Sequence, residues 1–280
     1  MGTAHVSQDS AVEVKEVVEL VQPDVLVVEL CRGRMSMLEL PDDLDQWLAA
    51  PMPSLYELLL RSPPSARVSS LMTYAMSALY REVGRTLGIV PGAEFRAGAK
   101  AARAIGSLLA LGDRPVQVTL ARTWHFLSFY QRLKLTAMVV YSLLKLSLTK
   151  EEVEAMKDLD KLYEMLLELQ EHFPSLPRTL ISERDDYLAA GILQAPGRRV
   201  VVVVGFGHLA GIMQRLEQNQ AIDLEEISVI PVSHPWANIA FVATVLGILG
   251  SLSALLLYLG YWLIAAFVSL LLHLVLSSSA

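Results

Sequence analysis

The chain contains 280 residues, of which 53% are hydrophobic and only 19% are charged. An ordinary soluble enzyme of this length carries more charge, so the composition excludes a protein that is soluble along its whole length. The formal net charge is −6, and Lys and Arg are interspersed with Asp and Glu, which argues against a nucleic-acid partner. A single cysteine, Cys31, excludes an intrachain disulfide and fits a reducing compartment.

The first predicted elements are a helix and a buried strand. Ser10-Ala-Val-Glu13 is a capping box that starts an amphipathic stretch through Val21. Residues 25–28, Val-Leu-Val-Val, form a continuous apolar run between turn residues, which predicts a strand buried on both faces of a parallel sheet. Glu29 follows at the C-terminal end of this strand.

A long middle section, residues 54–193, has helical spacing with few β-prone runs, which predicts a large helical insertion. Residues 151–171 within it have the pattern of one helix with a charged face. Five consecutive valines at residues 200–204 are the clearest buried strand, and Gly205-Phe-Gly-His208 follows at once with a helical pattern. Residues 227–232 are a candidate last strand. The predicted fold class is α/β, with a small, mostly parallel sheet, the helical insertion and C-terminal transmembrane helices.

The C-terminal part has no charged side chain, because no Asp, Glu, Lys or Arg follows Glu226. Residues 236–280 are apolar over far more than the roughly 20 residues of one spanning helix, which predicts two passes, or one pass and a re-entrant piece. Aromatic side chains at Trp236 and again about one span later favour a helical hairpin with two interfacial belts. The alternative is a buried helix pair in a soluble core.

We therefore divide the chain into an α/β domain, residues 1–231, and a membrane anchor, residues 232–280. The expected partner of residues 236–277 is the lipid bilayer. The N-terminus has no apolar run and so no secretory signal, which places the α/β domain in the cytosol. Only Met1 precedes Gly2, although a strand leading into Gly2 would need about five residues, so the first strand is expected to be missing.

Two Gly-x-x-His elements are the strongest chemical signal, Gly2-Thr-Ala-His5 and Gly205-Phe-Gly-His208. Ligands of open α/β sheets gather at the C-terminal ends of strands, so His5, His208 and Glu29 are expected to converge there. Imidazole and carboxylate suit a divalent transition metal, and a metal-bound water is a nucleophile near neutral pH. Two alternatives remain: each histidine alone fits a packing role, and the G-x-G-x-x-x-G spacing from Gly205 to Gly211 fits, less well, a phosphate at a helix N-terminus.

Other charged residues have simpler interpretations. Glu94 opens a predicted helix, where a carboxylate interacts favourably with the helix dipole. Asp113 follows a glycine in a turn, for which aspartate is common. The four charges at residues 183–186 are typical of a solvated helix start, and Cys31 of a small buried side chain.

Several motifs together, in this order, resemble the TraB/PrgY family, whose wider superfamily includes the metal-dependent Tiki proteases. The motifs are Gly-Thr-Ala-His5, the Val-Val-Glu29-Leu-Cys-Arg32 strand end, Glu94-Phe-Arg96, Gly-Asp113-Arg114, Glu183-Arg184-Asp185 and Gly205-Phe-Gly-His208-Leu-Ala-Gly211. The resemblance covers nearly the whole domain. It implies a divalent-metal site of His5, His208 and Glu29 with Glu94 or Glu183, and it makes Asp185 a further candidate catalytic residue. It also implies that Arg32, Arg114 and Arg184 bind substrate or carboxylates, and that the protein is located at the mitochondrial outer membrane.

Two functions are therefore expected. The first is a membrane-anchored, metal-dependent hydrolase that acts on a peptide or protein substrate through a metal-activated water. The second is a non-catalytic organelle-surface adaptor or regulatory membrane protein that uses the domain for binding.

Overall fold

The computed structural model describes residues 1–3, 8–52, 54–61, 80–86, 88–145, 170–218 and 222–231, with a few single residues outside these ranges. Three predictions fall outside this part: the position of His5, the helix over most of residues 151–171, and the hairpin over nearly all of residues 236–277. Within the described residues, no helix has both the length and the apolar character needed to cross a membrane.

The described strands form a parallel four-stranded sheet in the order β1-β4-β2-β3. The strands are β1 (Gly2–Thr3), β2 (Val25–Val28), β3 (Leu108–Leu111) and β4 (Val200–Gly205). Val28 at the end of β2 lies opposite Leu111 of β3 and Val203 of β4. The α/β class and the parallel sheet are confirmed, as are the two valine-rich strands. Gly2–Thr3 supplies a two-residue first strand where none was expected.

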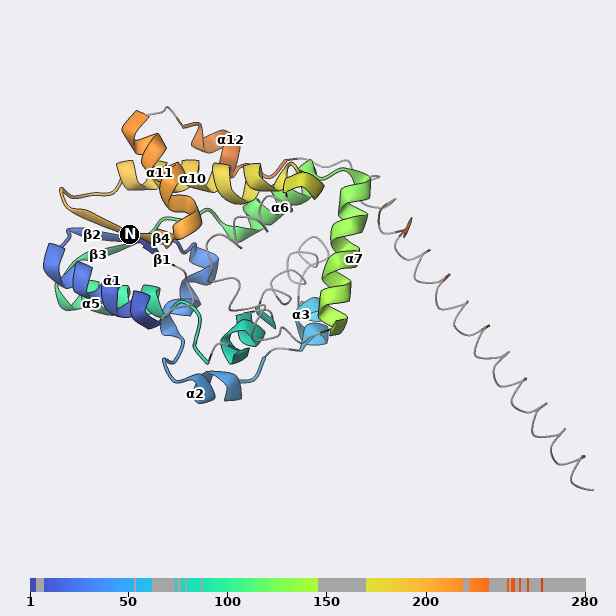
Figure 1. The fold of residues 1–280 in the computed structure, drawn as a ribbon, viewed down its shortest axis with the longest axis horizontal. Helices are drawn as coiled ribbons and strands as arrows, with labels where there is room; N and C mark the ends of the chain where they lie inside the picture. Colours follow the sequence, from blue (N-terminus) through green and yellow to red (C-terminus); the bar gives the residue numbers. More distant parts are fainter. Residues whose placement is uncertain are drawn as a thin grey trace, which may run out of the picture.

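Helices cover both faces of the sheet, which explains why its central strands are apolar on both sides. One face packs against α1 (Gln8–Val21) and α5 (Ala93–Ala104), and the other against α10 (Glu183–Leu193) and α11 (Phe206–Gln218) (Figure 1). Val14 and Val18 of α1 pack with Leu26 and Val28, and Leu188 of α10 packs with Val204. The helices packed on the two faces of the sheet therefore fix the positions of the strand ends.

The rest of the described domain is helical. These elements are η1 (Arg32–Glu39), α2 (Leu44–Ala49), α3 (Leu55–Arg61), α6 (Val116–Phe126), α7 (Phe129–Lys145), the π-helical turn η3 (Arg178–Ser182) and α12 (Leu224–Ser228). The strand predicted at residues 227–232 is wrong, because α12 runs through Ser228. The side chain of Asp223 accepts a hydrogen bond from the Glu226 amide at 3.0 Å and so caps this helix.

Candidate functional site

Five polar side chains meet at the C-terminal edge of the sheet: Glu29, Asp113, Arg184, Asp185 and His208. Glu29 follows β2, Asp113 follows β3, and His208 lies in the first turn of α11 after β4. Arg184 and Asp185 come from the start of α10, which packs against α11. Parallel strands bring their C-terminal ends to one edge, so residues far apart in the sequence become neighbours. The expected convergence of Glu29 and His208 is confirmed, because Glu29 Oε1 lies 3.5 Å from His208 Nε2.

Glu29 is buried, and two hydrogen-bond donors hold its carboxylate. Its Oε2 accepts a hydrogen bond from the Gly205 amide at 2.5 Å, and its Oε1 pairs with Nη2 of Arg184. Gly205 directly precedes α11, so the Glu29 carboxylate occupies the N-terminal end of that helix. A carboxylate of the protein itself therefore stands where the phosphate interpretation of the glycine motif would put a ligand.

Arg184 connects the carboxylates to the imidazole. Its Nε and Nη2 each donate to Asp113 at 3.0 Å, and its Nη1 lies 2.9 Å from His208 Nε2. Burial alone would lower the pKa of Arg184, but Asp113 and Glu29 outweigh it and raise this pKa above its ordinary value. The guanidinium is therefore a permanent positive charge inside the cluster.

The hydrogen bonds of His208 define which ring nitrogen carries the proton. A guanidinium only donates, so the neighbouring Nε2 must accept, and Nδ1–H donates to Asp185 Oδ1 at 2.6 Å. Burial raises the pKa of Asp185, and the hydrogen bond from His208 opposes that rise. The lone pair of Nε2 consequently points toward Glu29 and Arg184. A carboxylate on the second nitrogen is also the usual partner of a metal-binding histidine.

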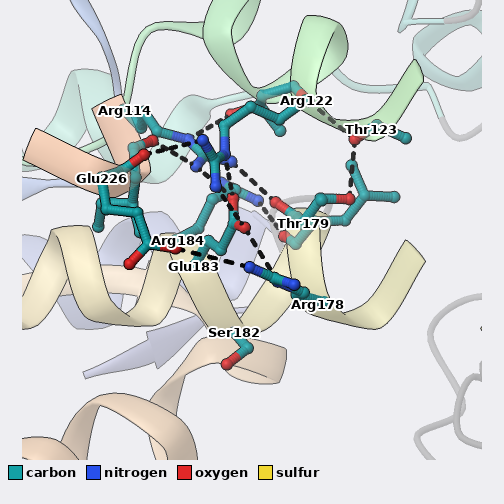
Figure 2. A network of polar contacts seen from close by, with 12 residues as sticks. Arg114, Arg122, Thr123, Arg178, Thr179, Ser182, Glu183, Arg184 and Glu226 are labelled. Carbon is teal, nitrogen blue, oxygen red and sulfur yellow. Dashed lines mark hydrogen bonds and ion pairs between the residues drawn. The ribbon is translucent and has the colours of Figure 1, made fainter. Parts of the chain in front are cut away.

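Glu183 and Arg114 belong to a separate buried network beside this cluster (Figure 2). Arg114 and Arg122 each donate to Glu183 at 2.7 Å, and the same guanidinium of Arg114 donates to the Thr179 and Ile227 carbonyls at 2.9 Å. Burial raises the pKa of Glu183, but these two arginines outweigh it, so the pKa lies below its ordinary value. The solvated interpretation of residues 183–186 is wrong for Glu183 and Asp185, which are buried.

The remaining predicted residues lie elsewhere or outside the described part. Glu94 is fully buried in the first turn of α5 and lines a cleft of about 470 Å³ beside α1, on the other side of the sheet from α10. Arg32 is exposed at the start of η1. His5 is outside the described residues, although the adjacent strand β1 pairs with β4.

Sequence reasoning missed two members of the site. Asp113 was interpreted as a turn residue, and recognition of β3 was the missing signal, because Asp113 comes two residues after this strand. Arg34 belongs to no motif of the sequence that points to the site. Its Nη2 donates to Asp113 Oδ2 and, at 3.2 Å, to the Glu29 carbonyl. Burial lowers the pKa of Arg34, but Asp113 outweighs it and raises the value above the ordinary one, so this second guanidinium is also charged.

The donor set fits part of a metal site. Two ligands bound tetrahedrally at about 2.0–2.1 Å stand about 3.4 Å apart, close to the 3.5 Å between Glu29 Oε1 and His208 Nε2. Among the described residues, however, no group of three or more His, Cys, Asp or Glu side chains is arranged to hold a metal ion. The third predicted ligand, His5, lies outside that set.

A comparison with family models matches residues 1–225 to the TraB/PrgY/gumN family. The chain belongs to this family. A TraB domain-containing protein of Bos taurus is 36% identical over 297 aligned positions, which cover 98% of this chain and 75% of the relative. One of Mus musculus is 35% identical, covering 94% and 72%. An uncharacterised protein of Methanocaldococcus jannaschii is 28% identical, covering 81% and 56%. The resemblance predicted from the ordered TraB/PrgY motifs is confirmed.

Proposed function

We propose that this TraB-family chain is a metal-dependent hydrolase of peptide bonds, with its site at the C-terminal edge of the sheet. The observation that supports this most strongly is the state of His208. Nε2 accepts a hydrogen bond from Arg184 and Nδ1–H donates one to Asp185, so the unprotonated ring nitrogen lies 3.5 Å from the Glu29 carboxylate, and a metal would replace Arg184 as the partner of its lone pair. A neutral imidazole and a carboxylate at this separation are suitable first ligands of a divalent metal.

Each residue of the site then has a distinct role. Glu29 and His208 hold the metal, which when bound lowers the pKa of a coordinated water to near 7. Asp185 keeps the imidazole in the tautomer that exposes Nε2. Arg184 and Arg34 supply fixed positive charge beside the site, which stabilises negative charge that develops on a substrate oxygen. Asp113 holds both guanidinium groups in place.

A second function, a non-catalytic adaptor on an organelle surface, is favoured by a different observation. Arg184 pairs with both Glu29 and Asp113 and contacts His208, so the cluster satisfies its charges without any ligand. A buried polar cluster whose charges are paired in this way has a structural role, which is to position α10 on the strand ends. In that case the domain recognises a partner through its surface.

Metal retention and peptide cleavage separate the two functions. The purified chain is stripped with chelator, loaded with Mn²⁺, Co²⁺ or Zn²⁺, desalted and assayed for metal per chain and for cleavage of a mixed peptide library. The hydrolase predicts about one ion per chain, lost in His208→Ala and reduced at least tenfold in affinity in Glu29→Gln. His125→Ala, in α6, is the matched control and keeps the metal. Equal retention in all variants, or none in the wild type, overturns the proposal in favour of the adaptor.

We also propose that the chain is anchored in a membrane with its α/β domain in the cytosol. The family resemblance indicates that this membrane is the mitochondrial outer membrane. The charge-free chain after Glu226 supports this, because its apolar run exceeds one bilayer span. The lipid contact of residue 251, measured in the experiment described below, tests the anchoring.

A further inference from the structure

Four exposed apolar side chains surround the place where the domain leads into the charge-free C-terminal part. Phe129 and Tyr130, at the start of α7, are 48% and 71% exposed, and Val229 and Ile230, after α12, are 54% and 50% exposed. We call these four residues the corner surface. Isolated exposed apolar residues are common, so the corner surface has meaning only through the contacts that connect its parts.

The first connection fixes α12 to α6. Arg122 of α6 donates through Nη1 to the carbonyl of Glu226 at 2.8 Å and to that of Val229 at 3.0 Å. The same guanidinium lies over the Phe126 ring, 5.6 Å from its centroid, and pairs with Glu183 through Nε. A buried, multiply bonded arginine therefore holds the chain just before Pro231 against the C-terminal part of α6.

The second connection comes from beyond residue 231. The Phe241 ring makes edge contacts with Trp124 of α6 at 5.0 Å and with Phe129 of α7 at 6.0 Å, and it is only 8% exposed. Phe241 belongs to the charge-free stretch of residues 236–280. Val229 and Phe241, on either side of residues 232–240, thus both contact the α6–α7 corner.

We propose that the corner surface is a docking surface for the lipid bilayer, so that the domain rests on the membrane that its C-terminal segment enters. The occupant follows from the attached chain: 45 consecutive residues without charge begin at Trp236, and Phe241 within them packs against the corner. Aromatic residues prefer the membrane interface, where Tyr130 and Phe129 then lie.

The corner surface and the sheet lie in different parts of the domain. In Figure 1, α7 stands at one end of the domain and the labelled strands lie toward the other, so contact at α7 does not cover the sheet. The inference rests on the proposed membrane anchoring and is independent of the proposed hydrolysis. A failed metal experiment therefore leaves it unaffected.

Single-cysteine labelling of the full chain tests the surface, because the natural Cys31 is buried and resists labelling. An environment-sensitive fluorophore is attached to Tyr130→Cys, to Ile230→Cys, to Leu20→Cys on α1 as an exposed control, and to Ser251→Cys as a marker of insertion. Each protein is reconstituted into phosphatidylcholine vesicles whose lipids carry a nitroxide quencher near the headgroup or deeper in the acyl chain.

The proposal predicts that the headgroup-level quencher reduces fluorescence at residues 130 and 230 at least twofold relative to residue 20, while residue 251 responds to the acyl-chain quencher. If residue 251 is quenched and residues 130 and 230 behave like residue 20, the chain is anchored and the docking surface is wrong. If residue 251 is not quenched either, the anchoring proposal fails and the docking surface fails with it.

Discussion

The ring of His208 has two nitrogens with different partners, and this difference determines what the site can do. Arg184 contributes a donor that never loses its proton, so Nε2 is the acceptor. Asp185 accepts a hydrogen bond from Nδ1–H inside the core. No sequence pattern indicates which ring nitrogen is protonated. The protonation follows only once α10 is known to lie across the end of β4.

Two glycines near His208 in the sequence have different surroundings. Gly207 and Gly211 both lie within α11. A Cβ at Gly211 would lie 2.7 Å from Cγ of Asp185, whereas one at Gly207 would meet no atom within 4 Å. Gly211 therefore allows α10 to approach α11 closely enough for Asp185 to reach His208.

This contrast predicts opposite effects of the same substitution. Gly211→Ala gains about 1 kcal/mol of helix propensity but forces Asp185 aside, at a cost of about 1–3 kcal/mol for overpacking. We expect a net loss of up to about 2 kcal/mol in the free energy of unfolding, measured by urea denaturation. Gly207→Ala is the matched control and should leave stability unchanged or raise it by up to about 1 kcal/mol. Equal effects of both would show that α10 and α11 are not in close contact at Asp185.

Among the elements, α10 connects two networks through consecutive residues. Glu183 binds the arginines that hold α6 and α12, while Arg184 and Asp185 belong to the site. A charge run of this kind is usually solvated, and only the arginines of other elements explain its burial. Arg114 and Arg122 come from the segment after β3, so the pairing could not be predicted while that strand was unrecognised.

Removal of the Glu183 charge tests the α10 network. Glu183→Gln leaves Arg114 and Arg122 buried without their carboxylate, and breaking such a pair costs about 3–5 kcal/mol. We expect that loss in the free energy of unfolding at pH 7, with Glu225→Gln, an exposed position on α12, within about 0.5 kcal/mol of wild type.

The pH dependence has a defined sign. Because the pKa of Glu183 is lowered by folding, its contribution is complete above the ordinary value of 4.5 and is lost as the pH falls through the lower folded value. The stability difference between wild type and Glu183→Gln should therefore shrink below pH 4.5. A difference that stays constant down to pH 3 would mean that the Glu183 carboxylate is not preferentially stabilised in the folded chain.

Two elements show the limits of pattern analysis. β3 reads Leu-Leu-Ala-Leu, four residues that suit a helix equally well, and only pairing with β2 makes it a strand. The apolar residues after Ile227 suggested a strand, but the Asp223 cap begins a helix first. By contrast, the valine runs of β2 and β4 were predictable, because a strand buried on both faces needs no alternation.

At the scale of the whole molecule, the parallel sheet alone brought Glu29 and His208 together, and this much followed from the sequence. Ligands of open α/β sheets bind at the C-terminal ends of the strands, and this rule predicted the location of the site. The arginines could not be placed, since their partners come from helices whose packing the periodicity does not encode. The corner surface was likewise invisible, because it depends on the Val229 carbonyl and the Phe241 ring meeting Arg122 and Trp124 of α6 from a distant part of the chain.

The nitrogen spectrum of the His208 ring tests the central claim most directly. With ¹⁵N-labelled histidine in the full chain, and with the resonances assigned through His208→Ala, the metal-free ring should show a protonated Nδ1 and an unprotonated Nε2. One equivalent of Zn²⁺ should shift the Nε2 resonance, while Nδ1 stays protonated and hydrogen-bonded to Asp185. A His208 ring that is protonated on Nε2, or that does not respond to saturating Zn²⁺, would contradict the account.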